Sequence, residues 1–135
     1  RDAAVMVAPP DGLPCPAACA RLGRKLTLGR DGVVMLPERA GPETDPRLVA
    51  RLAPALPSLA ERAAALVLSG GATARCVLDG LGIGELRLMG EIEPGIPLAL
   101  ASHRNRILAV VLKAGGFGDA NSLRRVQQHL RGIRT

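Results

Sequence analysis

The chain has 135 residues and an apolar share of 47%, enough for one domain with a substantial hydrophobic core. Its formal net charge of +6 comes from scattered basic residues without a block of five like charges, and it contains no Trp or Tyr. Because proteins that bind single-stranded nucleic acid usually stack bases on aromatic rings, this composition disfavours a nucleic-acid partner. No apolar run approaches ~18 residues, so a membrane span is not expected either.

The cysteine pattern bears on the compartment. Cys15, Cys19 and Cys76 form neither an even-numbered disulfide framework nor a zinc-ligand pattern, and nothing at the start of the chain resembles a signal peptide. These features favour a cytoplasmic protein in which all three thiols are reduced.

The first third of the chain predicts short elements separated by turn residues. An apolar strand is expected over 3–8, and a short helix over 16–22 that is ended by Gly23. Two further strands are expected over 25–28 and 33–36, around an Asp-Gly turn.

A proline-bearing loop is expected over 37–46, followed by a helical stretch over 47–65. Pro54 and Pro57 should divide that stretch into two helices, because proline inside a helix removes a backbone hydrogen bond.

Two later stretches share the order strand, glycine turn, helix. In the first, an apolar run at 65–68 precedes a Ser-Gly-Gly turn at 69–71 and a helix that Gly82 should end in a left-handed conformation. In the second, the most apolar run, at 107–112, precedes a glycine-rich turn at 114–118 and the terminal helix. We expect the 107–112 strand to be central in its sheet.

This alternation predicts an α/β fold, a layered α/β/α domain with a mostly parallel or mixed sheet. Ligands of open α/β sheets bind beyond the carboxyl ends of the strands, so the two glycine turns should form one anion-binding edge. Unpaired amides there favour phosphate, and Lys113 adds a full charge. The alternatives are tight connections without a ligand, and a lysine that only reaches for solvent. No Walker pattern is present, so phosphate binding would rest on backbone amides.

The segment between the turns predicts a half-exposed strand over 85–89 and a strand over 98–101. Two prolines and two glycines at 90–97 predict a fixed loop. A polar turn is expected over 102–106.

Two carboxylates of the predicted loop, Glu91 and Glu93, are candidate Mg²⁺ ligands. Solvation is favoured for Glu93, and the role of Glu91 is open. The terminal helix carries four basic residues off its apolar stripe, a pattern typical of a solvated face. They are Arg124, Arg125, Arg131 and Arg134.

A hydrolase would need Ser69 as a nucleophile, with His103 or His129 as its base. The nucleophile-elbow motif requires Gly two residues before the serine, and Val67 stands there, which disfavours this class.

Three motifs occur in order: Gly-Gly-Ala-Thr-Ala at 70–74, Gly-Glu-Ile-Glu-Pro-Gly-Ile-Pro at 90–97, and Lys-Ala-Gly-Gly-Phe-Gly at 113–118. With them the sequence resembles the C-terminal nucleotide-binding domain of the four-carbon acid sugar kinases, clearly over 66–130. Family members often have Asp where Ala72 stands, so any contact from that carboxylate would be absent.

The resemblance implies that residues 1–135 are the ATP-binding part of a kinase acting on threonate, erythronate or 3-oxo-tetronate. ATP or ADP with Mg²⁺ would be its ligands. The sugar acid would bind to an N-terminal domain missing from this sequence, so this chain alone is expected to be inactive. The alternative is a stand-alone, non-catalytic module for a nucleotide or another phosphate ligand. The residues predicted to hold the nucleotide are Ser69, Gly70, Gly71, Ala72, Thr73, Lys113, Gly115, Gly116 and Gly118.

Overall fold

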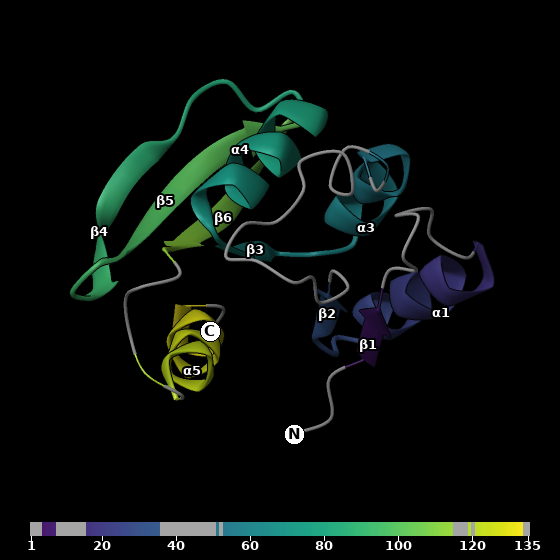
Figure 1. The fold of residues 1–135 in the computed structure, drawn as a ribbon, viewed down its shortest axis with the longest axis horizontal. Helices are drawn as coiled ribbons and strands as arrows, with labels where there is room; N and C mark the ends of the chain where they lie inside the picture. The colour runs from purple at the N-terminus through teal and green to yellow at the C-terminus, as the bar shows by residue number, and fades with distance from the viewer. Residues whose placement is uncertain are drawn as a thin grey trace, which may run out of the picture.

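The computed structural model describes residues 4–7, 16–35, 51, 53–114, 119 and 121–133, which form two β-sheets and the helices around them (Figure 1). The strands are β1 Ala4–Val7, β2 Gly32–Met35, β3 Ala65–Ser69, β4 Arg87–Glu93, β5 Ile96–His103 and β6 Arg106–Lys113. The helices are α1 Pro16–Thr27, the 3-10 helix η1 Ala53–Ala55, α3 Leu56–Glu61, α4 Gly71–Gly80 and α5 Ser122–Ile133.

The larger sheet is mixed and has the order β3-β6-β5-β4. Strand β6 pairs in parallel with β3 and antiparallel with β5, and β5 pairs antiparallel with β4. Leu108, Val110 and Val111 of β6 are fully buried, as expected for the most apolar run of the chain. The prediction of an interior strand over 107–112 is therefore confirmed.

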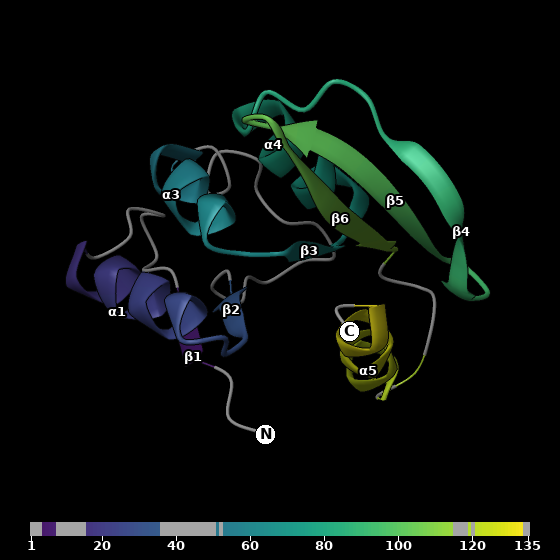
Figure 2. The same ribbon diagram turned by 180° about the vertical axis from the view of Figure 1, so that it is seen from behind.

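Helices cover both faces of this sheet. Successive side chains of a strand point to opposite faces, so residues of β6 pack against different helices. Leu108 and Val110 share a hydrophobic core with Val77 of α4, whereas Val111 packs with Val126 of α5. Seen from behind, α3 and α4 lie together along the sheet, and α5 lies near the end of β6 (Figure 2). The predicted layered α/β/α architecture is confirmed.

The smaller sheet pairs β1 in parallel with β2, and α1 connects the two strands. In both ribbon views this unit lies on the β3 side of the larger sheet (Figures 1 and 2). Leu22 of α1 packs against Leu59 of α3, which joins the unit to the rest of the fold.

Helix α1 corrects two predictions. It does not end at Gly23, and residues 25–28 are its last turn and the turn that follows, not a strand. Gly23 is buried, and a Cβ there would overlap the Arg62 guanidinium, so this glycine provides close packing inside a helix. The helix ends at Thr27, and Gly29 just beyond it has a φ of 80°, the left-handed conformation expected of a glycine that follows a helix end.

Two other helix boundaries agree with the sequence. The second helix predicted in the proline-rich stretch is α3, with Pro57 in its first turn and η1 just before it, but it ends at Glu61 and not at 65. Residues 36–50, which include the loop predicted over 37–46 and most of the first predicted helix, lie outside the described residues. Gly82 ends α4 with a φ of 72°, and the amide of Ile83 donates to the carbonyl of Leu78 at 2.9 Å. The left-handed helix end predicted at Gly82 is confirmed.

The fixed loop predicted over 90–97 is wrong, because β4 continues through Glu93 and a tight turn leads directly into β5. The pairing of β4 with β5 shifts register between Leu88 and Gly90, and again between Glu91 and Glu93. Gly90 has a φ of 136°, which glycine adopts without steric strain, so a residue typical of loops here serves a β-bulge.

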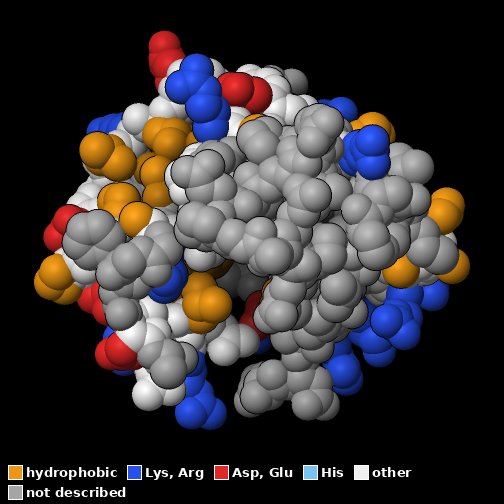
Figure 3. Space-filling model, viewed as in Figure 1, with side chains coloured by type: hydrophobic (Ala, Val, Ile, Leu, Met, Phe, Trp, Pro, Cys, Tyr) orange, Lys and Arg blue, Asp and Glu red, His pale blue; other side chains and the backbone are white. Residues whose placement is uncertain are grey.

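The outer strand β4 carries exposed apolar side chains. Leu88 and Met89 are 68% and 53% exposed. Hydrophobic side chains gather over this part of the face in Figure 3.

Within the described residues, no helix is both long enough and apolar enough to cross a membrane.

Candidate nucleotide site

The two predicted glycine turns start side by side. Ser69, the last residue of β3, is in register with Lys113, the last residue of β6. The amide of Gly70 donates a hydrogen bond to the carbonyl oxygen of Lys113 at 2.8 Å. The carboxyl ends of the two parallel strands therefore lie at one edge of the sheet, as predicted. Gly115, Gly116 and Gly118 lie outside the described residues, and their part in the site remains a prediction.

Helix α4 begins at this edge with an open N-terminus. Its N-cap is Gly70, with φ 93° and ψ 132°, and it makes no side-chain cap hydrogen bond. The first helical hydrogen bond runs from the amide of Ala74 to the carbonyl of Gly70 at 2.9 Å. The amides of residues 71–73 therefore precede the first helical bond and lie where a helix favours an anion.

The remaining members of the predicted set surround this N-terminus. Ser69 is exposed at the end of β3, Thr73 is half-buried in the first turn of α4, and Ala72 lies between Gly71 and Thr73 in that turn. Lys113 is half-buried at the end of β6, and its Nζ lies 3.5 Å from the carbonyl oxygen of Ala114. This contact is long, so the ammonium group remains available to an incoming charge.

A cavity of about 740 Å³ opens at the same edge. Gly70, Gly71 and Lys113 line one part of it. Its apolar walls come from β3, α4, β5, β6 and the loop before β4. These walls are Leu68, Leu78, Ile83, Leu86, Pro97 and Leu112.

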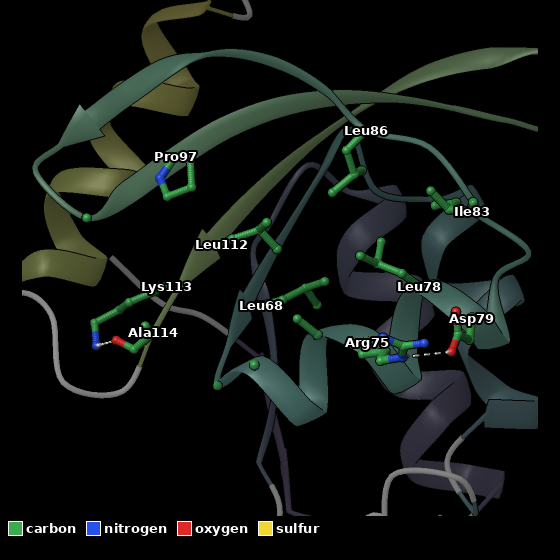
Figure 4. A pocket seen from close by; sticks show the side chains of 15 residues that line it. Leu68, Arg75, Leu78, Asp79, Ile83, Leu86, Pro97, Leu112, Lys113 and Ala114 are labelled. Atoms are coloured by element: carbon green, nitrogen blue, oxygen red, sulfur yellow. Dashed lines mark hydrogen bonds and ion pairs between the residues drawn. The ribbon is translucent and has the colours of Figure 1, made fainter.

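The close view in Figure 4 shows how the lining is arranged. The leucine and isoleucine side chains point toward one another, with Lys113 on one side of them and the Arg75–Asp79 pair on the other. Arg75 and Asp79 are 86% and 71% exposed, and their atoms are 3.9 Å apart, so they form a loose pair at the rim. The cavity thus has two parts: an end that carries Lys113 and the first amides of α4, and an aliphatic slot formed by the leucine and isoleucine side chains with Pro97.

Glu91 and Glu93 point to opposite faces of the sheet because the bulge lies between them. Glu91 is exposed and in register with Pro97, a cavity residue, and directly paired residues of antiparallel strands share a face. Glu93 lies on the α5 side, where Arg125 donates to it at 2.7 Å and 3.1 Å.

The predictions of a solvated Glu93 and a solvated Arg125 are therefore wrong. Hydrogen bonds from Arg125 hold the pKa of Glu93 below its ordinary value and also lower the pKa of Asp119. Arg131 is likewise paired, with Asp31 at 2.9 Å. Among the described residues, no group of three His, Cys, Asp or Glu side chains forms a metal site.

The geometry gives a hydrolase no base for Ser69. His103 is buried and in register with Arg106 at the start of β6, whereas Ser69 is in register with Lys113 at its end. Seven residue steps along a strand amount to about 23 Å. His129 is exposed on α5.

With the fold and the cavity described, the class of protein can be stated. The chain belongs to the nucleotide-binding C-terminal domain family, whose sequence pattern matches residues 31–123. Over part of its length it is similar to proteins named D-threonate kinase.

Two relatives carry that name. The D-threonate kinase of Cupriavidus necator is 39% identical over 110 residues, which are 78% of this chain and 25% of that protein. The D-threonate kinase of Bordetella bronchiseptica is 40% identical over 74 residues, 54% of this chain and 18% of that protein. The chain thus spans a quarter or less of these relatives.

Solved structures share the fold. A domain of unknown function from Bordetella bronchiseptica, crystallised with citrate as a domain-swapped dimer, superposes with a TM-score of 0.70 at 25% identity. The match covers 94% of this chain and 34% of that one. A Haemophilus influenzae protein gives a TM-score of 0.63 at 15% identity over 92% of this chain and 34% of that one, and supports the fold alone.

Sequence reasoning missed most of the aliphatic slot and all of the charge cluster around Arg125. Leu86 and Pro97 were expected only as strand and loop residues. The one sequence signal for this part of the cavity was the motif at 90–97, because its residues Gly95 and Pro97 line the cavity.

Proposed function

We propose that this chain binds ATP as the nucleotide-binding part of a kinase that phosphorylates four-carbon acid sugars. The observation that carries the proposal is the meeting of β3 and β6 at one edge, where the open N-terminus of α4 and Lys113 border a cavity. The D-threonate kinase relatives support the acid-sugar class, which includes threonate, erythronate and 3-oxo-tetronate.

The polyphosphate would bind at the cationic end of the cavity. The amides at the start of α4 would donate to phosphate oxygens, and Gly70 and Gly71 let the ligand approach the backbone closely. Lys113 would neutralise charge on the terminal phosphates, which phosphoryl transfer requires more than covalent catalysis. Gly115, Gly116 and Gly118 are proposed to add amides from the other strand end.

The base and ribose would occupy the aliphatic slot. A ring system fits between apolar walls such as Leu78, Ile83 and Leu86, which supply dispersion contact without aromatic stacking. Mg²⁺ would enter with the nucleotide, held mainly by phosphate oxygens and water. Glu93 is unsuited to the ion because Arg125 occupies its carboxylate, whereas Glu91 shares a face with the cavity residue Pro97.

The acid sugar is proposed to bind to a part of the relatives that lies outside the matched quarter of their length. We therefore expect that the purified 135-residue chain binds nucleotide but does not phosphorylate a sugar acid. Robust turnover of a four-carbon acid by this chain would contradict that expectation. Reading the gene upstream of Arg1 distinguishes the kinase part from a stand-alone binding module, since only the former has a further domain in frame.

The direct test is calorimetric titration of the chain with ATP, ADP, adenosine and inorganic phosphate, each with and without Mg²⁺. The proposal predicts saturable binding of ATP and ADP, weaker binding of adenosine, and an affinity for ATP that Mg²⁺ alters. Binding of phosphate with no preference for the nucleotides would favour a general phosphate module. No binding of any nucleotide would refute the proposal.

A further inference from the structure

A cluster of four side chains connects α5 to the end of β4. Arg125 donates from Nε to Glu93 Oε1 at 2.7 Å and from Nη2 to Glu93 Oε2 at 3.1 Å. The same Nη2 donates to Asp119 Oδ1 at 3.0 Å and to Ser122 Oγ at 3.2 Å. One planar guanidinium thus holds two carboxylates from segments 26 residues apart, 93 and 119 in the sequence.

Asp119 is fixed by the first turn of α5 from several directions. Its amide donates to Ser122 Oγ at 2.7 Å, and its carbonyl accepts from the Ser122 amide at 3.1 Å. Its Oδ1 also accepts from the Asn121 amide at 2.8 Å. Ser122 is fully buried, so its two hydrogen bonds with the backbone of Asp119 are shielded from water, whereas the bond from Asn121 is exposed. These bonds hold Asp119 at the start of α5, and Arg125 adds a hydrogen bond to its side chain.

The two carboxylates held by Arg125 adjoin two borders of the proposed nucleotide site. Glu93 immediately precedes the turn that contains Gly95, and both Gly95 and Pro97 line the cavity. Asp119 immediately follows the predicted glycine turn at 115–118, whose other side is Lys113 and Ala114, two further lining residues. Through Glu93 and Asp119, the cluster therefore connects the end of β4 to the start of α5.

We infer that Arg125 is a positioning residue for the nucleotide site, which holds the β4–β5 turn at the cavity by binding Glu93 and linking it to Asp119 at the start of α5. The inference rests on the proposed function. It assigns to Arg125 an effect on nucleotide affinity without direct contact with the ligand. Hydrogen bonds from Arg125 lower the pKa values of Glu93 and Asp119, the direction expected where a cation stabilises the ionised carboxylates.

The chain offers a matched control for a purely structural role. Arg131 lies on the same helix and forms an ion pair with Asp31 at 2.9 Å, with side-chain exposures of 36% and 35%. Asp31 and Arg131 do not line the cavity. Removing this pair loosens α5 without touching either border of the site. Arg124, exposed on the same helix, controls for the loss of one positive charge.

The experiment measures ADP affinity by calorimetry and thermal stability for the wild-type chain and its variants Arg125→Ala, Arg125→Lys, Arg131→Ala and Arg124→Ala. We expect Arg125→Ala to weaken ADP binding about tenfold or more, the scale of one or two lost hydrogen bonds. Arg125→Lys should be nearly as weak, because an ammonium group keeps the charge but cannot form the fork. Arg131→Ala should lower the Tm comparably while its ADP affinity stays within about twofold of wild type, and Arg124→Ala should change neither quantity.

The outcomes separate the two proposals. If the wild type binds ADP and Arg125→Ala binds equally well, or if Arg131→Ala weakens binding as much, the positioning role is wrong and the proposed function stands. If Arg125→Lys restores wild-type affinity, charge alone matters and the positioning role is also wrong. If the wild type binds no nucleotide, both proposals are wrong. Should Arg125→Ala not fold, Arg125→Lys and Asp119→Asn decide the matter, since both keep the helix register and each weakens the fork.

Discussion

The amide of Gly70, one residue beyond the end of β3, donates to the carbonyl oxygen of Lys113, the last residue of β6, across 2.8 Å. This hydrogen bond extends the parallel ladder into the turn, so the first glycine turn is fixed to the end of the second strand. The backbone of Lys113 is therefore held beside the first amides of α4, and its flexible side chain is within reach of a ligand bound there.

Lys113→Met should weaken ATP more than adenosine, because it removes a charge and keeps a long apolar stem. We expect about a tenfold or greater loss of ATP affinity, as for a hydrogen bond to a charged group. The Tm should change little, since the ammonium makes only a 3.5 Å contact with the carbonyl of Ala114. Calorimetry with both ligands at two salt concentrations checks this. Equal losses for ATP and adenosine would place Lys113 away from the phosphates.

Gly70→Ala and Gly71→Ala should separate stability from binding. Gly70 has a φ of 93°, so a Cβ there strains the backbone by about 1–3 kcal/mol and the Tm should fall. At Gly71 a Cβ would meet nothing within 4 Å, so folding should be unaffected or improved by helix propensity. Yet that methyl group would stand among the first amides of α4, so ADP affinity should drop. Wild-type ADP affinity in Gly71→Ala would exclude this helix start as the phosphate site.

The sheet edge was predictable because its signals are local. Apolar runs ended by glycine turns mark β3 and β6, and helical spacing after 71 marks α4. The two repeats of strand, glycine turn and helix predicted that these strands end at one edge, and the structure shows that β3 and β6 pair directly in parallel. The position of Lys113 at the edge required no long-range knowledge, since it is the first polar residue after the apolar run.

The charge cluster was not predictable, because it joins residues 32 positions apart. Glu93 stood in a stretch whose prolines and glycines indicate a loop, and only the bulge before it turns its side chain toward α5. Gly23 illustrates the same limitation. Its sequence neighbourhood indicates a helix end, but α1 continues through it to Thr27, and the nearby Arg62 guanidinium comes from a residue 39 positions away.

Leu108→Ala should destabilise the fold by about 2–5 kcal/mol, because Leu108 is fully buried and its loss leaves a cavity in the core shared with α4. Ile107, its neighbour in β6, is 65% exposed, so Ile107→Ala should cost no more than about 0.5 kcal/mol. Urea unfolding of both variants checks the difference. Similar costs for the two would mean that the assigned faces of β6 are interchanged.

Acidification should remove the contribution of the Arg125 cluster to stability. Hydrogen bonds from Arg125 lower the pKa values of Glu93 and Asp119 in the folded chain. Because the unfolded chain binds these protons at higher pH, the stabilisation is complete above the ordinary carboxyl range. It is lost as the pH falls from roughly 4 through the lower folded pKa values.

Other carboxylates also titrate in this range, so the useful quantity is the difference between the wild type and Glu93→Gln. The amide keeps the shape of the carboxylate but cannot gain a proton or hold a charge. The free energy of unfolding of the wild type should exceed that of Glu93→Gln at pH 7, and the two curves should converge between about pH 4 and pH 2. Urea titrations at stepped pH values measure both curves. If they stay parallel down to pH 3, the ion pair between Glu93 and Arg125 contributes nothing to the folded state.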